Sequence, residues 1–278
     1  MKIQDIRIGV LRIEGTNCEQ ESFDSFKRLG AKPEFVHLKQ LLGMDCNESE
    51  KRSIFDYQCL MIPGGFSAGD YIRAGAIFAA RIKSKLHKDL SDFVAQEFPI
   101  LGICNGFQVL TELGLLPGFD SEISSTPQAC LYINDSDRFE CRPTLLKHEN
   151  KGSCVFTSKI KKNDICLIPS AHAEGKLLFP KEKEKQYLKS LQDNDQIVFR
   201  YVDDEGTYAG YPWNPNGSLF NIAGICNYSG TVFGMMPHPE RTFFGYQHPD
   251  WTVQGSAEKN GDGRAVFESV LEYISRKF

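Results

Sequence analysis

The sequence predicts an α/β protein: an open, mostly parallel β-sheet with flanking helices, followed by a section of antiparallel strands. In residues 1–116, short apolar runs alternate with segments of helical periodicity, which is the order of parallel strands joined by crossover helices. From about residue 120 onward, strand-like runs follow one another with little helical pattern between them, which favours antiparallel pairing. Because there is no repeat and no low-complexity linker, we expect residues 1–278 to form one domain.

The first half of the chain supplies the parallel part of the expected sheet. Buried strands are expected at residues 6–13, 33–38, 57–62 and 100–103. The first helix would place Phe23, Phe26 and Leu29 on one face, with Thr16 or Asn17 as its N-cap. Helical patterns also cover residues 72–94 and the segment after Cys104, whereas residues 45–53 are polar and are expected to form a loop or the edge of a helix.

The second half supplies the antiparallel part. Strands are expected at residues 131–133, 139–146, 154–157, 165–169, 197–202, 222–226 and 231–236. The alternating charges of residues 181–185 indicate a solvated helix face, and a last helix is expected over residues 264–274.

Charge and hydropathy exclude some partners. The formal net charge is −4, which gives no general attraction to nucleic acid or to an anionic membrane surface. No apolar stretch approaches the length of a membrane span, and residues 1–7 lack the apolar core of a signal peptide. We therefore expect a cytoplasmic protein that binds neither nucleic acid nor membrane.

The nine cysteines do not form a recognisable framework. Their number is odd and no pair has the Cys-x-x-Cys spacing, so we expect neither a disulfide framework nor a metal site. Eight of them are expected to be reduced residues that pack as small hydrophobes. Only Cys104 lies in a context that requires a separate explanation.

Cys104 lies where an apolar strand changes abruptly into a helix. The segment Gly102-Ile103-Cys104-Asn105-Gly106 has the layout of a nucleophile elbow, with cysteine in the place of serine. The glycines are needed because a sharp turn of this kind leaves no room for Cβ atoms beside the nucleophile. The N-terminus of the following helix would favour the thiolate form. A buried structural cysteine beside glycines remains the alternative interpretation of this segment.

Two further segments could complete a site around Cys104. His238 follows the last apolar strand, and Glu240 follows two residues later, so the carboxylate could orient the imidazole. The carboxyl ends of parallel strands meet at one edge of a sheet, which would bring His238 close to Cys104. Gly65 lies in a Gly-Gly turn just after another strand, where backbone N–H groups can face a ligand. Each segment taken alone could equally be an ordinary loop.

Several motifs together resemble the class I glutamine amidotransferases, and among them the glutaminase subunits of phosphoribosylformylglycinamidine synthases, enzymes of purine biosynthesis. The matching segments occur in order between residues 6 and 241. They include Gly15-Thr16-Asn17-Cys18-Glu19, Pro63-Gly64-Gly65-Phe66-Ser67, Cys104-Asn105-Gly106-Phe107-Gln108 and Met235-Met236-Pro237-His238-Pro239-Glu240-Arg241. The chain departs from the family pattern at Glu14, where proline is usual, and at Ala173, where glycine is usual.

The resemblance implies a flavodoxin-like fold and assigns roles to individual residues. Cys104 would be the nucleophile, His238 the acid and base, and Glu240 the residue that orients His238. The N–H groups of Gly65 and Asn105 would form the oxyanion hole. In addition, Gln108 and Phe66 would contact the glutamine substrate, and His172 and Glu174 are candidates for a partner-facing surface or for an internal His–Glu hydrogen bond.

The resemblance also implies partners. The chain lacks an ATP-binding signature, so a large synthetase subunit would bind ATP and Mg²⁺ and use the ammonia, and a small third subunit would bridge the two. No cofactor is expected in this chain. Three alternatives stay open: an amidotransferase that serves a different acceptor, a non-catalytic regulatory subunit, and a cysteine peptidase.

Overall fold

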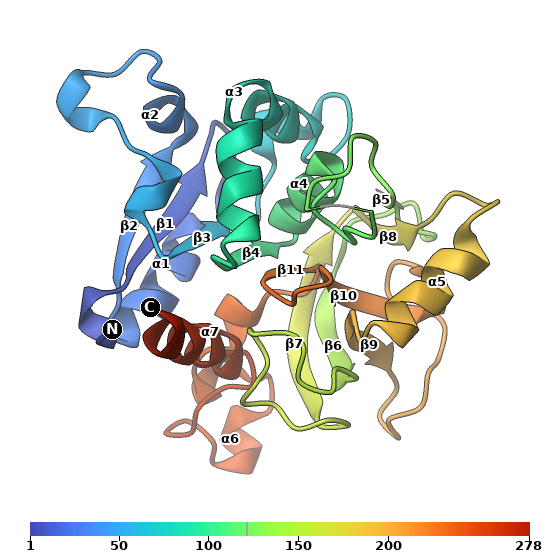
Figure 1. The fold of residues 1–278 in the computed structure, drawn as a ribbon. Coiled ribbons are helices and arrows are strands. Elements are labelled where there is room, and N and C mark those ends of the chain that lie inside the picture. The colour runs from blue at the N-terminus through green and yellow to red at the C-terminus, as the bar shows by residue number, and fades with distance from the viewer. Residues whose placement is uncertain (121) are drawn as a thin grey trace.

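The computed structural model describes residues 1–120 and 122–278, and its main element is a nine-stranded mixed sheet (Figure 1). The strand order is β2-β1-β3-β4-β11-β10-β9-β6-β7, and β5 and β8 form a separate two-stranded sheet. The strands are β1 (Arg7–Arg12), β2 (Lys32–His37), β3 (Cys59–Ile62), β4 (Ile100–Ile103), β5 (Cys130–Ile133), β6 (Glu140–His148), β7 (Ile165–His172), β8 (Glu174–Leu178), β9 (Ile197–Val202), β10 (Ile222–Cys226) and β11 (Val232–Met235).

The five strands from β2 to β11 in this order are parallel, and the four that follow are antiparallel. The predicted fold class is therefore confirmed. The helices are α1 (Glu19–Arg28), α2 (Leu38–Leu42), α3 (Ala76–Ala95), α4 (Asn105–Leu113), α5 (Glu184–Asp193), α6 (Trp251–Gln254) and α7 (Arg264–Lys277). No helix of the described residues is long and apolar enough to cross a membrane.

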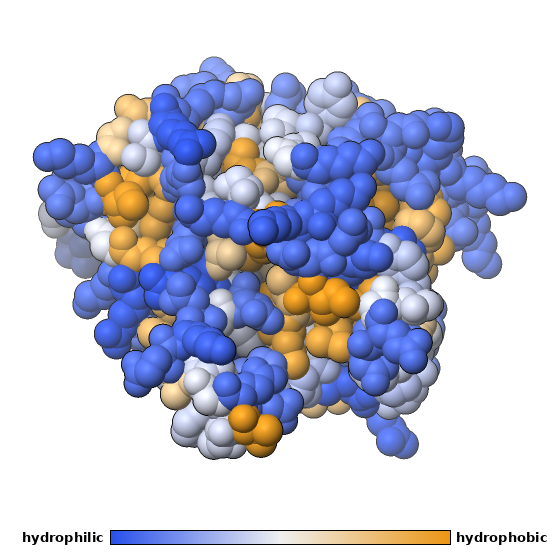
Figure 2. Space-filling view, turned by 90° about the horizontal axis from the view of Figure 1, so that it is seen from below, coloured by the Kyte–Doolittle hydropathy of each residue, from blue (hydrophilic) through white to orange (hydrophobic). Residues whose placement is uncertain are grey.

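Helices cover both faces of the parallel strands (Figure 1). Helices α3 and α4 pack together on one side, and α1 and α7 pack together on the other, where the rings of Phe26 and Phe267 meet edge to face at 5.2 Å. The four central parallel strands are apolar on both faces because both faces are covered. On the face that Figure 2 shows, the surface is mostly hydrophilic, and apolar side chains gather in separate patches.

Two local predictions were wrong. Residues 154–157 form a turn and not a strand, although Cys154 and Phe156 are fully buried, because their side chains fill the core without backbone pairing. The N-cap of α1 is Cys18, and neither predicted residue caps the helix. The hydroxyl of Thr16 instead accepts a hydrogen bond from the N–H of Ile13 at 3.2 Å, so it stabilises the turn before the helix.

Candidate active site

The turn between β4 and α4 holds Cys104 in an unusual backbone conformation. Its φ is 52° and its ψ is −107°, a combination that residues other than glycine rarely adopt. The N–H of Cys104 donates to the carbonyl of Met235 at 2.8 Å, which joins the turn to the neighbouring strand β11. A Cβ at Gly106 would lie 1.9 Å from the carbonyl oxygen of Ile62. The predicted requirement for glycine beside the cysteine is therefore confirmed.

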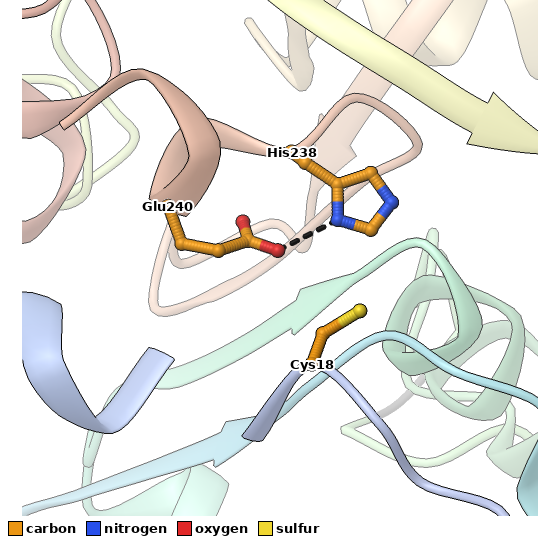
Figure 3. Close-up of side chains that lie close together, drawn as sticks. All are labelled: Cys18, His238 and Glu240. Atoms are coloured by element: carbon orange, nitrogen blue, oxygen red, sulfur yellow. Dashed lines mark hydrogen bonds and ion pairs between the residues drawn. The ribbon is translucent and has the colours of Figure 1, made fainter. Parts of the chain in front are cut away.

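His238 and Glu240 form a buried pair just after β11 (Figure 3). Nδ1 of His238 lies 2.6 Å from Oε1 of Glu240, and the two side chains are 2% and 0% exposed. The backbone N–H of His238 donates to the carbonyl of Pro169 in β7 at 2.8 Å, which joins this turn to β7. Burial favours the neutral ring, but the negative charges of Glu240 and of the Cys104 sulfur outweigh it and raise the pKa of His238 well above its ordinary value.

One pocket brings these two parts of the chain together. A Cβ at Gly64 would lie 2.9 Å from Cε1 of His238 and 3.4 Å from Cβ of Cys104, so the two residues meet above this glycine. Nε2 of His238 makes no hydrogen bond to the described residues and is available to exchange a proton with the sulfur. The pocket is lined by Asn17, Cys18, Gly65, Phe66, Asp70, Ala74, Cys104, Gln108, Phe139, Ala171, His172, Ala173, Glu174, His238 and Arg241.

Two backbone N–H groups beside Cys104 are free to bind an oxyanion. Within the described chain, neither the N–H of Gly65 nor that of Asn105 donates a hydrogen bond. Asn105 is the first residue of α4, where backbone N–H groups have no partner inside the helix. Gly65 has a φ of 140°, and a Cβ there would lie 2.7 Å from the N atom of Asn17. The oxyanion role of both residues stays a prediction.

Gln108 and Phe66 both lie in the pocket wall, in different environments. Gln108 is buried, and both ends of its amide are engaged: Nε2 donates to the carbonyl of Glu174 at 2.5 Å, and Oε1 accepts from Nδ2 of Asn105 at 2.9 Å. The structure therefore places Gln108 as a link between α4 and β8. The ring of Phe66 is 46% exposed and faces the ring of Phe139 at the mouth of the pocket.

His172 does not belong to an exposed surface, which corrects its assignment to a partner-facing one. It is 3% exposed and its Nδ1 lies 3.2 Å from Oδ1 of Asn134, so the alternative of a His–Glu hydrogen bond is also wrong. Burial and the positive charge of His238 lower the pKa of His172 to about 3, so the ring is neutral. Glu174 lines the pocket, and its Oε2 accepts from the N–H of Ala74 at 3.1 Å.

Three titratable residues of the pocket lining were not predicted as site residues from the sequence: Cys18, Asp70 and Arg241. Burial and the negative charge of Glu174 raise the pKa of Asp70 to about 6, and neither carboxylate has an ion-pair partner among the described residues. One guanidinium nitrogen of Arg241 donates to Sγ of Cys18 at 3.1 Å. Asp70 follows the Gly-Gly turn and Arg241 follows Glu240. Their closeness in sequence to these predicted site segments could have identified them.

Known proteins are similar to this chain in sequence and in fold. The family model of the CobB/CobQ-like glutamine amidotransferase domain matches residues 5–274. The phosphoribosylformylglycinamidine synthase subunit PurQ of Archaeoglobus fulgidus is 58% identical over 99% of this chain and 100% of the relative. The subunit of the same name from Picrophilus torridus is 49% identical over 87% of this chain and 89% of the relative. A chain of the solved PurLQS structure from Thermotoga maritima superposes with a TM-score of 0.70 at 31% identity, covering 97% of this chain and 99% of that one.

The family match over residues 5–274 shows that the chain is a glutamine amidotransferase, and the strand order, the cysteine turn and the buried His–Glu pair are consistent with that class. Within that class, the chain belongs to the family of phosphoribosylformylglycinamidine synthase subunits PurQ.

Proposed function

We propose that this chain hydrolyses L-glutamine to glutamate and ammonia, as the glutaminase subunit of a phosphoribosylformylglycinamidine synthase. The observation that carries the proposal is the meeting of Cys104, on its strained turn, with the buried His238–Glu240 pair in one pocket. These are the nucleophile, the base and the orienting carboxylate of acyl transfer. Membership of the PurQ family supports the choice of glutamine as the substrate.

The reaction follows from the positions of these groups. The Cys104 thiolate attacks the side-chain amide carbon of glutamine, and the N–H groups of Gly65 and Asn105 hold the oxyanion. His238 gives a proton to the leaving ammonia, which leaves a glutamyl thioester on the sulfur. The same ring then takes a proton from water, which attacks the thioester and releases glutamate. Glu240 accepts the Nδ1–H hydrogen bond and so keeps Nε2 directed at the reacting atoms.

The charges of the pocket fit the amino-acid end of glutamine. Asp70 and Glu174 place two carboxylates in the pocket wall without a cationic partner among the residues described. A bound ammonium group would neutralise them, and the α-amino group of glutamine is such a group at neutral pH. Gln108 supports this part of the wall because its amide joins Asn105 to the backbone of Glu174.

The released ammonia serves a synthetase partner. A large subunit that binds ATP and Mg²⁺ uses it to convert formylglycinamide ribonucleotide to formylglycinamidine ribonucleotide, and a small subunit bridges the two. Similarity over nearly the whole chain to a subunit of the PurLQS structure supports this assembly. A reducing, cytoplasmic location is part of the proposal, because Cys104 must stay a free thiol to react.

Covalent labelling with a diazo-ketone analogue of glutamine tests the proposal. The chain is treated with the analogue, alone and together with the synthetase subunit, and the adducts are located by mass spectrometry. A single adduct on Cys104, blocked by excess glutamine and lost in Cys104→Ala, is the expected result. No adduct under either condition would reject the enzyme and favour a regulatory subunit. Cleavage of peptides without release of ammonia from free glutamine would favour a peptidase.

A further inference from the structure

A second cysteine lies beside the catalytic pair and has no role in the proposed reaction. Sγ of Cys18 points toward the ring of His238 (Figure 3), and one sulfur, one nitrogen and one oxygen atom of Cys18, His238 and Glu240 all lie within 4.8 Å of one another. All three residues are buried. They come from two ends of the chain, which is why the spacing of cysteines in the sequence gave no sign of this cluster.

Two buried atoms of this cluster make no hydrogen bond to the described residues: Nε2 of His238 and Oε2 of Glu240. The side chain of Glu240 is 0% exposed. A buried carboxylate oxygen without a partner is costly, and such an atom commonly contacts a water molecule or an ion. Figure 3 shows that Oε1 is the oxygen directed at the ring, whereas Oε2 is turned away from the ring and from Cys18, so the carboxylate binds an ion either through Oε1 or after a rotation that turns Oε2 inward.

From this geometry we propose that Cys18, His238 and Glu240 form a binding site for a thiophilic divalent cation of the Zn²⁺ type. Sulfur, nitrogen and oxygen donors lie about 2.0 to 2.3 Å from Zn²⁺, so in a tetrahedral site they are about 3.3 to 3.8 Å from one another. The three side chains, whose donor atoms lie within 4.8 Å, therefore have to draw together around the ion, and the 2.6 Å hydrogen bond between His238 and Glu240 has to open. Three protein ligands would leave the fourth position of a tetrahedral ion open, and the Arg241 hydrogen bond to Sγ can persist outside the first shell.

Binding of the ion would prevent His238 from acting as a base. The ion replaces the thiol proton of Cys18 and the proton on Nδ1 of His238, and both protons are released to solvent. The ring keeps its other proton on Nε2, so it can no longer accept one from Cys104. Glutamine hydrolysis would then be inhibited reversibly, and a chelator would restore it. The cation site does not depend on the proposed function, because metal binding can be measured without any turnover.

Cobalt titration of the full chain tests the site, because Co²⁺ replaces Zn²⁺ and its absorption spectrum reports thiolate ligands. We expect one equivalent of Co²⁺ to give a thiolate-to-metal charge-transfer band. Cys18→Ser should abolish this band and weaken Co²⁺ binding at least ~10-fold. The matched control is Cys141→Ser, which changes an exposed cysteine on β6 and should leave the titration unchanged.

X-ray absorption of the Zn²⁺-loaded wild-type chain provides a readout that needs no variant. One sulfur together with nitrogen and oxygen neighbours is the expected first shell. Two sulfur ligands, or a cobalt band that survives Cys18→Ser but is lost in Cys104→Ala, would place the ion on the nucleophile and overturn the proposal. Failure of Zn²⁺ and Co²⁺ to bind would overturn it as well, and would assign a water molecule to Oε2 of Glu240.

Discussion

Replacing Asp70 by asparagine tests whether the pocket binds an ammonium group. Burial and the nearby charge of Glu174 raise the pKa of Asp70 from 3.8 to about 6. Because the pKa is higher in the folded chain than in the unfolded one, the folded chain holds the proton more tightly. The stabilisation that the proton provides is present below about pH 4 and is lost as the pH rises to about 6. Above that pH the ionised Asp70 lowers the free energy of unfolding of the chain when no ligand is bound.

The size of this effect follows from the shift. Two pKa units correspond to an upper limit of about 3 kcal/mol, and solvent screening of this half-buried carboxylate reduces the effect to about 1 kcal/mol. Asp70→Asn should therefore raise the free energy of unfolding by about 1 kcal/mol at pH 8 and leave it unchanged near pH 4. The corresponding rise in Tm at pH 8 is about 2 to 4 °C for a chain of this size.

The same substitution should weaken catalysis on glutamine. Loss of a charged hydrogen bond costs about 1.5 to 3 kcal/mol, which is roughly 10- to 100-fold in kcat/KM. The assay compares L-glutamine with glutaramate, which lacks the α-amino group, and only the rate on L-glutamine should fall. Glu112→Gln is the matched control: Glu112 pairs with Arg73, so this change should not stabilise the chain or alter the ratio. An Asp70→Asn variant with an unchanged substrate ratio, or with lower stability than wild type at pH 8, would refute the reasoning.

Three further predictions concern the catalytic pair, the turn and the partner. Glu240→Gln should lower kcat by roughly 100- to 10,000-fold in steady-state assays, because the ring loses the group that orients it; an unchanged kcat would exclude this role. Gly106→Ala should lower the free energy of unfolding by about 1 to 3 kcal/mol in urea titrations, because its Cβ would overlap a carbonyl oxygen. Gly210→Ala, where nothing lies within 4 Å, is the control and should change little. Finally, the isolated chain should release little ammonia until the synthetase subunit is added, and equal turnover with and without it would contradict that dependence.

The positions of the parallel strands along the chain and the turn at Cys104 could be predicted because both depend on local sequence patterns. Apolar runs bounded by glycine and proline mark the parallel strands, and the glycines around Cys104 mark the sharp turn. The hydrogen bonds of turns were harder to predict: a threonine just before a helix is a typical N-cap, but the hydroxyl of Thr16 accepts from the N–H of Ile13, which precedes it in the sequence. Whether residues 1–278 form a single domain stays a prediction.

The candidate site was predictable to the extent that its residues lie in sequence motifs. His238 and Glu240 are two positions apart, so their pairing could be inferred from the segment itself. The proximity of Cys18 to that pair depends on how the start of α1 meets the end of β11, and no local pattern encodes it. His172 was misplaced because alternation along β7 and β8 does not reveal which face of the strands is covered.

The pairing of β4 with β11 also determines at which stage of chain synthesis the pocket can form. The strand that binds the N–H of Cys104 comes from residues 232–235, and the backbone N–H of His238 donates to a carbonyl of β7. A ribosome must therefore synthesise most of the chain before Cys104 meets the base that we propose for it. Under the proposed mechanism, fragments that end before residue 238 contain Cys104 but lack that base, so we expect incomplete chains not to hydrolyse glutamine.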